Sequence, residues 1–212
     1  KYSTAPITHN STIHFSVNNE TLFSHLDFAS FDSYATSDNY KMFLFNCDLW
    51  RNLKKDKEFW VMETSPSYSA SLENYAKPHP NGYLKVEAVA SYALGGRAFC
   101  YWLWRQQRTG CEQPHSSVIS AWGSPTVGYP NILEVEKARK EIESIIFNSK
   151  ATQADIAITY SDQAKVFFKT EPLHYDYNDL ISKFYKLMLE TGLHRDLIPE
   201  NASLQGYKIL YS

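Results

Sequence analysis

The residues best suited to chemistry in this sequence stand where apolar, strand-like runs end. Glu63 closes the run FWVME, Tyr34 closes LDFASFDSY, and Trp102 lies near the end of AFCYWLW. Glu112 and His115 follow in the polar loop after that last run. A carboxylate beside hydroxyl, aromatic and imidazole groups suits the cleavage of a glycosidic bond, in which a carboxylate attacks the anomeric carbon while polar groups bind the sugar hydroxyls.

Each of these residues also has an ordinary structural interpretation. Glu63, taken alone, is a carboxylate that forms a salt bridge at a strand end. Tyr34 and Trp102 are large side chains that pack in cores, and Glu112 and His115 can pair across a turn. The functional hypothesis depends on their coincidence, because the C-terminal ends of parallel barrel strands meet at one rim.

The elements that must position these residues alternate between strands and helices. Strands are expected at the apolar runs 5–9, 26–34, 59–63, 98–104, 154–160, 197–198 and 207–211. Helices are expected at the periodic segments 40–54, 83–94, 131–147 and 179–190, and glycines cap the second and fourth of them. This order predicts an α/β protein with parallel sheets and right-handed crossovers.

The series of elements divides at the linker-like segment 148–152. Residues 1–150 hold about four βα units, which cannot close an eight-stranded barrel, so we expect the C-terminal half of a (β/α)8 TIM barrel. Residues 151–212 open a second α/β domain and end on a strand. Both ends of the chain therefore look cut, and we expect a longer parent protein.

Composition sets the broad class. The chain has 212 residues, a formal net charge of −2 and scattered basic residues, which gives no sign of nucleic-acid binding. The one basic cluster, residues 54–57, fits a solvated helix end, with a phosphate or acidic-partner patch as the alternative. No apolar run is long enough to span a membrane. Three cysteines without metal-ligand spacing favour buried, reduced thiols and a cytoplasmic location.

Three ordered segments resemble a known family. WVMETSPS at 60–67, YWLWRQQRTGCEQPHSS at 101–117 and LDFASFDSY at 26–34 are similar to the β-galactosidases of glycoside hydrolase family 42. The resemblance extends more weakly from about residue 8 to the end of the chain. From residue 151 onward, it implies the start of a flavodoxin-like domain that makes a trimer contact, and hence a homotrimeric parent.

The resemblance also implies roles for single residues. Glu63 would be the catalytic nucleophile, and Tyr34 would line the galactose subsite and hydrogen-bond near it. Trp102 would lie beside the sugar. Glu112 and His115 would hydrogen-bond galactose hydroxyls. No cofactor or metal is implied.

Two departures from the family pattern matter. Where the family usually has a tryptophan eight residues after the nucleophile, this sequence has Ser71, and Tyr68 or Tyr75 could substitute for it. The family's acid/base glutamate, which follows an asparagine, and an early arginine have no counterpart in these 212 residues. The expected activity is therefore retaining hydrolysis of terminal β-D-galactosides by the parent, with this chain inactive alone. Two alternatives are a non-catalytic carbohydrate-binding or assembly module and a related glycosidase such as an α-L-arabinopyranosidase.

Overall fold

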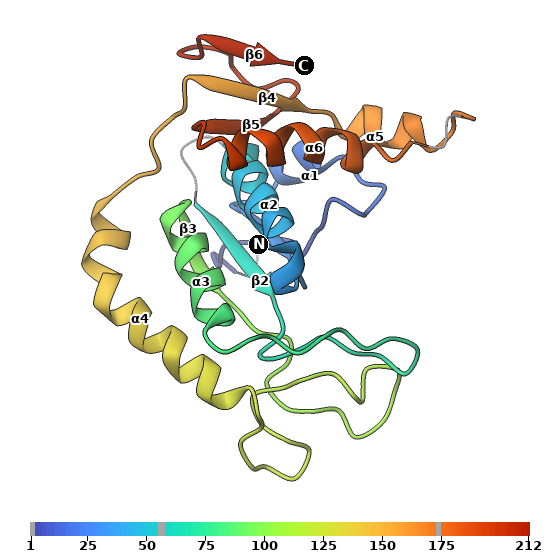
Figure 1. Ribbon diagram of the computed structural model, residues 1–212, viewed down its shortest axis with the longest axis vertical. Coiled ribbons are helices and arrows are strands. Elements are labelled where there is room, and N and C mark those ends of the chain that lie inside the picture. The colour runs from blue at the N-terminus through green and yellow to red at the C-terminus, as the bar shows by residue number, and fades with distance from the viewer. Residues whose placement is uncertain (1–2, 55–57, 173–174) are drawn as a thin grey trace.

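The chain folds around two separate three-stranded parallel sheets. The computed structural model describes residues 3–54, 58–172 and 175–212. The first sheet has the order β1-β2-β3, and the second has the order β5-β4-β6. In Figure 1, helix α2 lies between the two sheets. The predicted α/β class with parallel sheets is confirmed.

The first sheet consists of β1 (Ala29–Asp32), β2 (Phe59–Glu63) and β3 (Gly96–Phe99). Its connections run through α2 (Tyr40–Leu53), which follows the short 3-10 helix η1 (Ser37–Asn39), and through α3 (Tyr83–Ala93). A long helix, α4 (Tyr129–Asn148), packs along the outer side of α3 (Figure 1). All pairings are parallel, so the C-terminal ends of the three strands lie at one edge.

Aromatic residues fill the layer between the first sheet and α2. Phe31 of β1 contacts Phe43 and Trp50 of α2 and Phe59 of β2, with ring centroids 5.0 to 6.3 Å apart. The Trp50 indole also donates to the carbonyl of Ser30 at 2.8 Å, which satisfies its only polar atom. This packing fixes the positions of β1 and β2 relative to α2, and therefore the positions of their last residues.

The second sheet consists of β4 (Ile156–Tyr160), β5 (Arg195–Pro199) and β6 (Ile209–Tyr211), with β4 in the centre. Helices α5 (Asp162–Phe168) and α6 (Tyr177–Glu190) connect β4 to β5. We refer below to residues 3–148 as the first region and to residues 154–211 as the second region.

Side-chain caps set the start of both connecting helices. Ser161 accepts from the amide of Ala164 at the start of α5, and Asp176 accepts from that of Asp179 at the start of α6. Each cap satisfies a backbone donor that has no partner within its own helix, so the two helices begin at defined residues.

The structure corrects several expected boundaries. Segment 5–9 forms no regular strand, although the Ile7 carbonyl accepts from the amide of Asp27, just before β1, and the His9 carbonyl accepts from the Ser30 hydroxyl in β1. The predicted strand 98–104 was wrong at both ends, because β3 begins at Gly96 and its ladder stops at Phe99. Beyond it the chain still follows β2, with the Trp102 amide donating to the Thr64 carbonyl at 2.9 Å. Helices α1 (Asn19–Ser24) and α5 were not expected, since each is too short to show a clear period.

The structure tests the expectations for the basic cluster and for the cysteines only in part. Of the basic cluster 54–57, residues 55–57 lie outside the described residues, and Lys54 donates to the carbonyl of Phe23 at 3.0 Å. Cys47 is buried as expected, but Cys111 is exposed, which contradicts the expectation of buried thiols for that residue. None of the helices in the described ranges is long and apolar enough to cross a membrane.

Candidate active site

Glu63 ends β2 with a hydrogen-bond donor on each carboxylate oxygen. The hydroxyl of Tyr34 donates to Oε2 at 2.7 Å, and the side-chain amide of Asn10 donates to Oε1 at 2.9 Å. These bonds come from two segments that precede β2 in the chain. Two donors on two oxygens hold the carboxylate in one orientation, and both bonds strengthen when the carboxylate is ionised. Glu63 does not form the salt bridge that its ordinary interpretation required, within the residues that the structure describes.

Tyr34 joins Glu63 to the Glu112–His115 loop. Burial, the hydrogen bond to Glu63 and nearby carboxylates including Glu112 raise the pKa of Tyr34 far above its ordinary value, so the phenol stays a donor. On its other side, the Tyr34 ring meets the His115 ring edge-on, with centroids 5.6 Å apart. The structure therefore brings together four of the residues singled out in the sequence.

His115 is buried, and its ring orientation is fixed by a neighbour in sequence. Nδ1 lies 2.8 Å from the carbonyl oxygen of Ser116. Because a carbonyl oxygen only accepts, Nδ1 carries the proton and Nε2 remains for another partner. Glu112 accepts a long bond from the Gln107 amide, at 3.5 Å. The suggested pairing of Glu112 and His115 exists only in the backbone, where the His115 amide donates to the Glu112 carbonyl at 2.9 Å.

Trp102 follows β3 beside the end of β2. Its backbone amide bonds to Thr64, the residue after Glu63, and its side chain is half-buried. The indole Nε1 is buried and has no hydrogen-bond partner among the described residues. An unpaired buried donor is costly, so this indole is suited to an acceptor supplied by a ligand or by another segment.

Asn10 and Asp32 belong to the site, although sequence reasoning did not select them. Asp32 pairs with Glu63 in the register of β1 and β2, and the Asn10 amide lies against both carboxyl groups. Burial, followed by the negative charge of Glu63, raises the pKa of Asp32 from 3.8 to about 7, and the bond from Asn10 opposes the shift. Below pH 7, Asp32 is mostly protonated and adds no second charge beside Glu63.

A usable signal existed for both missed residues. Asn10 comes directly after the predicted strand 5–9, and Asp32 lies in the same strand-end segment as Tyr34. Applying the strand-end rule to every polar side chain, rather than to the residues with a familiar pattern, would have found them.

Ser71 lies in the loop that follows β2. Its amide donates to the carbonyl of Asn74 at 2.7 Å, in a small hairpin closed by a bridge between Ala70 and Tyr75. The backbone of Tyr68 is bonded to the Ser116 hydroxyl at 3.1 Å, next to His115. Of the two tyrosines that could substitute for the family's tryptophan, Tyr75 is exposed, and Tyr68 has this backbone contact beside His115.

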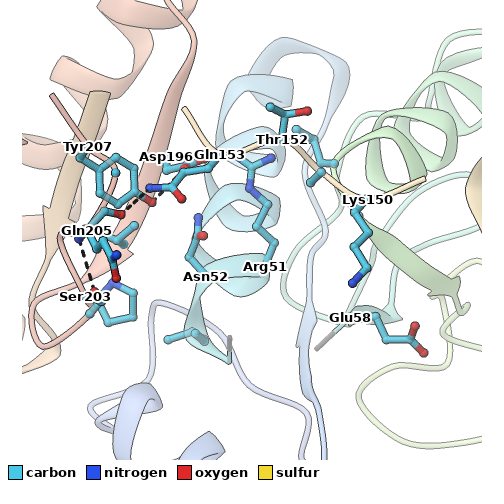
Figure 2. Close-up of a pocket in the computed structure, with 18 of the residues that line it drawn as sticks. Arg51, Asn52, Glu58, Lys150, Thr152, Gln153, Asp196, Ser203, Gln205 and Tyr207 are labelled. Carbon is cyan, nitrogen blue, oxygen red and sulfur yellow. Dashed lines mark hydrogen bonds and ion pairs between the residues drawn. The ribbon is translucent and has the colours of Figure 1, made fainter. Parts of the chain in front are cut away.

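A large cleft lies elsewhere. It has a volume of about 740 Å³ and lies between the two regions, near the N-terminal ends of β2 and β3. In Figure 2, Ser203, Gln205 and Tyr207 lie on one side of it and Lys150 and Glu58 on the other, with Arg51 between them. None of the five residues selected from the sequence lines this cleft. In parallel barrels that end supports stability, so the cleft does not compete with the Glu63 site as a catalytic centre.

Comparison with known proteins gives consistent matches over the whole chain. The sequence family described as "Beta-galactosidase" matches residues 1–144, and that described as "Beta-galactosidase trimerisation domain" matches residues 154–211. The chain is 64% identical over its full length to β-galactosidase YesZ of Bacillus licheniformis, and 60% identical to that of Bacillus subtilis. It spans only about a third of those relatives, 32% of each.

Solved structures give the same fold. A β-galactosidase from Bacillus circulans sp. alkalophilus superposes with a TM-score of 0.86 at 19% identity, over 97% of this chain and 31% of the other. A β-galactosidase from Halorubrum lacusprofundi superposes with a TM-score of 0.80 at 24% identity, over 95% of this chain and 32% of the other. The expected fold, part of a (β/α)8 barrel followed by part of a second α/β unit, is thereby confirmed.

Proposed function

This chain belongs to the β-galactosidases of glycoside hydrolase family 42, and from that premise we propose that it supplies the nucleophile side of a retaining β-galactosidase active site. Glu63 is the nucleophile. The observation that carries this proposal is the pair of bonds from Tyr34 and Asn10, which orient both Glu63 oxygens at a strand end. We also propose 1–150 and 151–212 as the domain limits.

The reaction proceeds in two steps. Glu63 attacks the anomeric carbon of a terminal β-galactoside and forms a glycosyl ester as the bond to the leaving oxygen breaks. A second carboxyl group protonates that oxygen and then removes a proton from the water that releases galactose. We assign this acid/base to the remainder of a longer protein, called the whole protein below. The 212-residue chain alone is therefore expected to be inactive.

The neighbours of Glu63 would bind the sugar. His115, with Nε2 free of the Ser116 contact, and Glu112 bind galactose hydroxyls, while Trp102 presents its ring and its indole donor. Such a site discriminates strongly, because a missing or misplaced hydroxyl leaves buried polar groups unpaired.

The loop after β2 bears on specificity. Tyr68 takes the place of the tryptophan that the family has where this chain has Ser71. An α-L-arabinopyranoside shares the galactose configuration, so a comparison of aryl glycosides in one assay decides between the two glycosidase activities.

We further propose that the whole protein is a cytoplasmic homotrimer. The match of residues 154–211 to a trimerisation domain supports the trimer, and three free cysteines suit a reducing compartment. Light scattering tests the first point, and a strictly monomeric whole protein would contradict it.

Trapping of the glycosyl ester tests the role of Glu63. A 2-deoxy-2-fluoro-β-galactoside with a good leaving group slows ester hydrolysis more than ester formation, so the labelled enzyme accumulates. Mass spectrometry of the whole protein after digestion should find the fluorogalactosyl group on Glu63. A label on any other residue would contradict the assignment. Galactose affinity without labelling or turnover would instead favour the alternative of a carbohydrate-binding module.

A further inference from the structure

Segment 11–18 links Asn10, which bonds to Glu63, to helix α1, which begins at Asn19. This segment has no regular strand or helix of its own. Side chains of the second region reach it at several points. Loops that carry functional residues need such external support, because they lack a ladder of backbone hydrogen bonds.

The centre of this support is a buried ion pair in α5. Lys165 and Asp162 are 2% and 6% exposed, and Lys165 Nζ lies 2.5 Å from Asp162 Oδ1. The second Asp162 oxygen accepts from the backbone amide of Asn19 at 2.8 Å, and Lys165 also reaches the carbonyl of Val17 at 3.3 Å. The bond between Asn19 and Asp162 joins the start of α1 to the start of α5, and both helices are labelled in Figure 1.

The pair is connected to the Glu63 site through two further buried residues. The Asn19 side chain, fully buried, donates to Asp162 at 3.3 Å and accepts from the Ser11 hydroxyl at 2.5 Å. Ser11, also fully buried, follows Asn10 directly, and its carbonyl accepts from the amide of Asp32 at 2.9 Å. A continuous series of buried hydrogen bonds thus leads from α5 to the residue beside Asn10.

A second contact joins segment 11–18 to α6. The side-chain amide of Asn178 donates to the carbonyl of Ile13 at 3.3 Å, and Asn178 is itself held by the hydroxyl of Tyr160 at 2.6 Å. All three residues are buried. Buried polar groups are retained only where their partners are placed accurately, so this set of bonds fixes the segment in one position.

We propose that Asp162 and Lys165 are positioning residues for the active site: through Asn19 and Ser11 they hold Asn10 against Glu63. The second region would then do more than assemble subunits, because it would set the geometry of the nucleophile within the same chain. This inference rests on the proposed role of Glu63. A displacement of about 1 Å at a catalytic group can cost about a hundredfold in rate, so a remote anchor has a measurable effect.

A second polar contact between the two regions provides a matched control. Arg51 of α2 lies 2.5 Å from Asp196 of β5 and 2.6 Å from Asp48, and all three are largely buried. In the described structure, none of these three side chains bonds to Asn10 or Glu63. Breaking this contact should loosen the same two regions without moving Asn10.

The test is a double-mutant cycle in the whole protein, with aryl β-galactoside turnover as the readout, at a temperature where every variant is folded. Asp162→Asn should lower kcat about tenfold with little change in KM, and Asn10→Ala should do the same. The kcat of the double variant should equal that of Asn10→Ala alone, because both changes remove the same function, the hold of Asn10 on Glu63. The control variant Asp196→Asn should lower the denaturation midpoint, keep kcat, and combine additively with Asn10→Ala.

The position of the acidic limb of the kcat/KM profile is the second readout, since loss of the Asn10 bond removes a donor from the Glu63 carboxylate. Asp162→Asn should shift that limb in the direction of Asn10→Ala, which a purely structural loss would not do. If Asp162→Asn does not fold, Ser11→Ala serves in the same cycle, because it removes only the hydroxyl.

Additive effects, or normal kcat and pH profile in both Asp162→Asn and Ser11→Ala, would overturn the inference. Glu63→Gln measured in the same assay separates this outcome from failure of the proposed function. Full turnover by Glu63→Gln contradicts the nucleophile, whereas its inactivity together with an additive cycle contradicts only the positioning role.

Discussion

Glu63 and Arg51 lie near opposite ends of the first region, and their surroundings differ in kind. Glu63 is met by neutral donors, the Tyr34 hydroxyl and the Asn10 amide, so its charge is oriented but not cancelled. Arg51 lies between the carboxylates of Asp48 and Asp196, so its charge is neutralised. The first arrangement leaves a carboxylate able to react, and the second joins two regions. Charge alone therefore does not distinguish these two surroundings, but the type of partner does.

The largest expected effect breaks the Glu63 arrangement directly. Glu63→Gln in the whole protein keeps the shape and both neighbours but removes the proposed nucleophile, so kcat should fall by about 10⁴-fold or more. Hydrolysis of an aryl β-galactoside measures this loss. Glu73→Gln is the matched control, because Glu73 is exposed in the loop after β2. A comparable fall in kcat for Glu73→Gln would show that the loss in Glu63→Gln is not specific to Glu63.

A buried acid behind the active site gives the next effect. Burial raises the pKa of Glu87 in α3 from 4.5 to about 8, and the Thr64 hydroxyl donates a hydrogen bond to its carboxyl group at 3.3 Å. The unfolded chain ionises this group near pH 4.5 but the folded protein only near pH 8, so stability is lost as pH rises through that window. The loss should be on the order of 4 kcal/mol by about pH 9.

Urea denaturation of Glu87→Gln at several pH values checks this expectation. The variant should lack the titration and should gain stability relative to the wild type between about pH 5 and about pH 9. Glu134→Gln, at an exposed position of α4, should show the wild-type dependence. Parallel curves for the wild type and Glu87→Gln would disprove a neutral Glu87 in the folded state.

The Arg51 arrangement should respond in stability and not in chemistry. Arg51→Met leaves Asp48 and Asp196 buried without their shared cation, which should cost about 3 kcal/mol of unfolding free energy. The denaturation midpoint measures the cost, and kcat at a temperature where the variant is folded should match the wild type. A large fall in kcat with an unchanged midpoint would reverse the comparison with Glu63.

Tyr34→Phe should have the smallest of these effects. It removes one of the two donors to Glu63 but leaves the Asn10 bond, so kcat should fall roughly tenfold to a hundredfold. Steady-state kinetics measures the change, and Tyr175→Phe, at an exposed tyrosine of the second region, should be neutral. An undiminished kcat for Tyr34→Phe would show that orientation of Glu63 by the phenol is not needed.

Local sequence signals predicted the elements that are long or uniformly apolar. The strand 59–63 has the predicted limits, and α2 and α4 differ from prediction by one or two residues, since their apolar periods extend over several turns. The predicted strand 98–104 was wrong because an aromatic run favours a strand in sequence, whereas tertiary contacts end the ladder of β3 at Phe99. Helix α5 was missed because seven residues give little periodicity and its cap, Ser161, is an ordinary loop residue.

The sequence by itself determined the family, the parallel α/β class and the group of Glu63, Tyr34 and His115 at one strand-end rim, because residue type and alternation are written locally along the chain. Only the tertiary structure decided that Asn10 and Asp32 adjoin Glu63, and that Asn19, Asp162 and Lys165 form one buried set. These pairs are separated by as many as 143 residues, and no local pattern encodes which distant polar groups satisfy one another once both are removed from water.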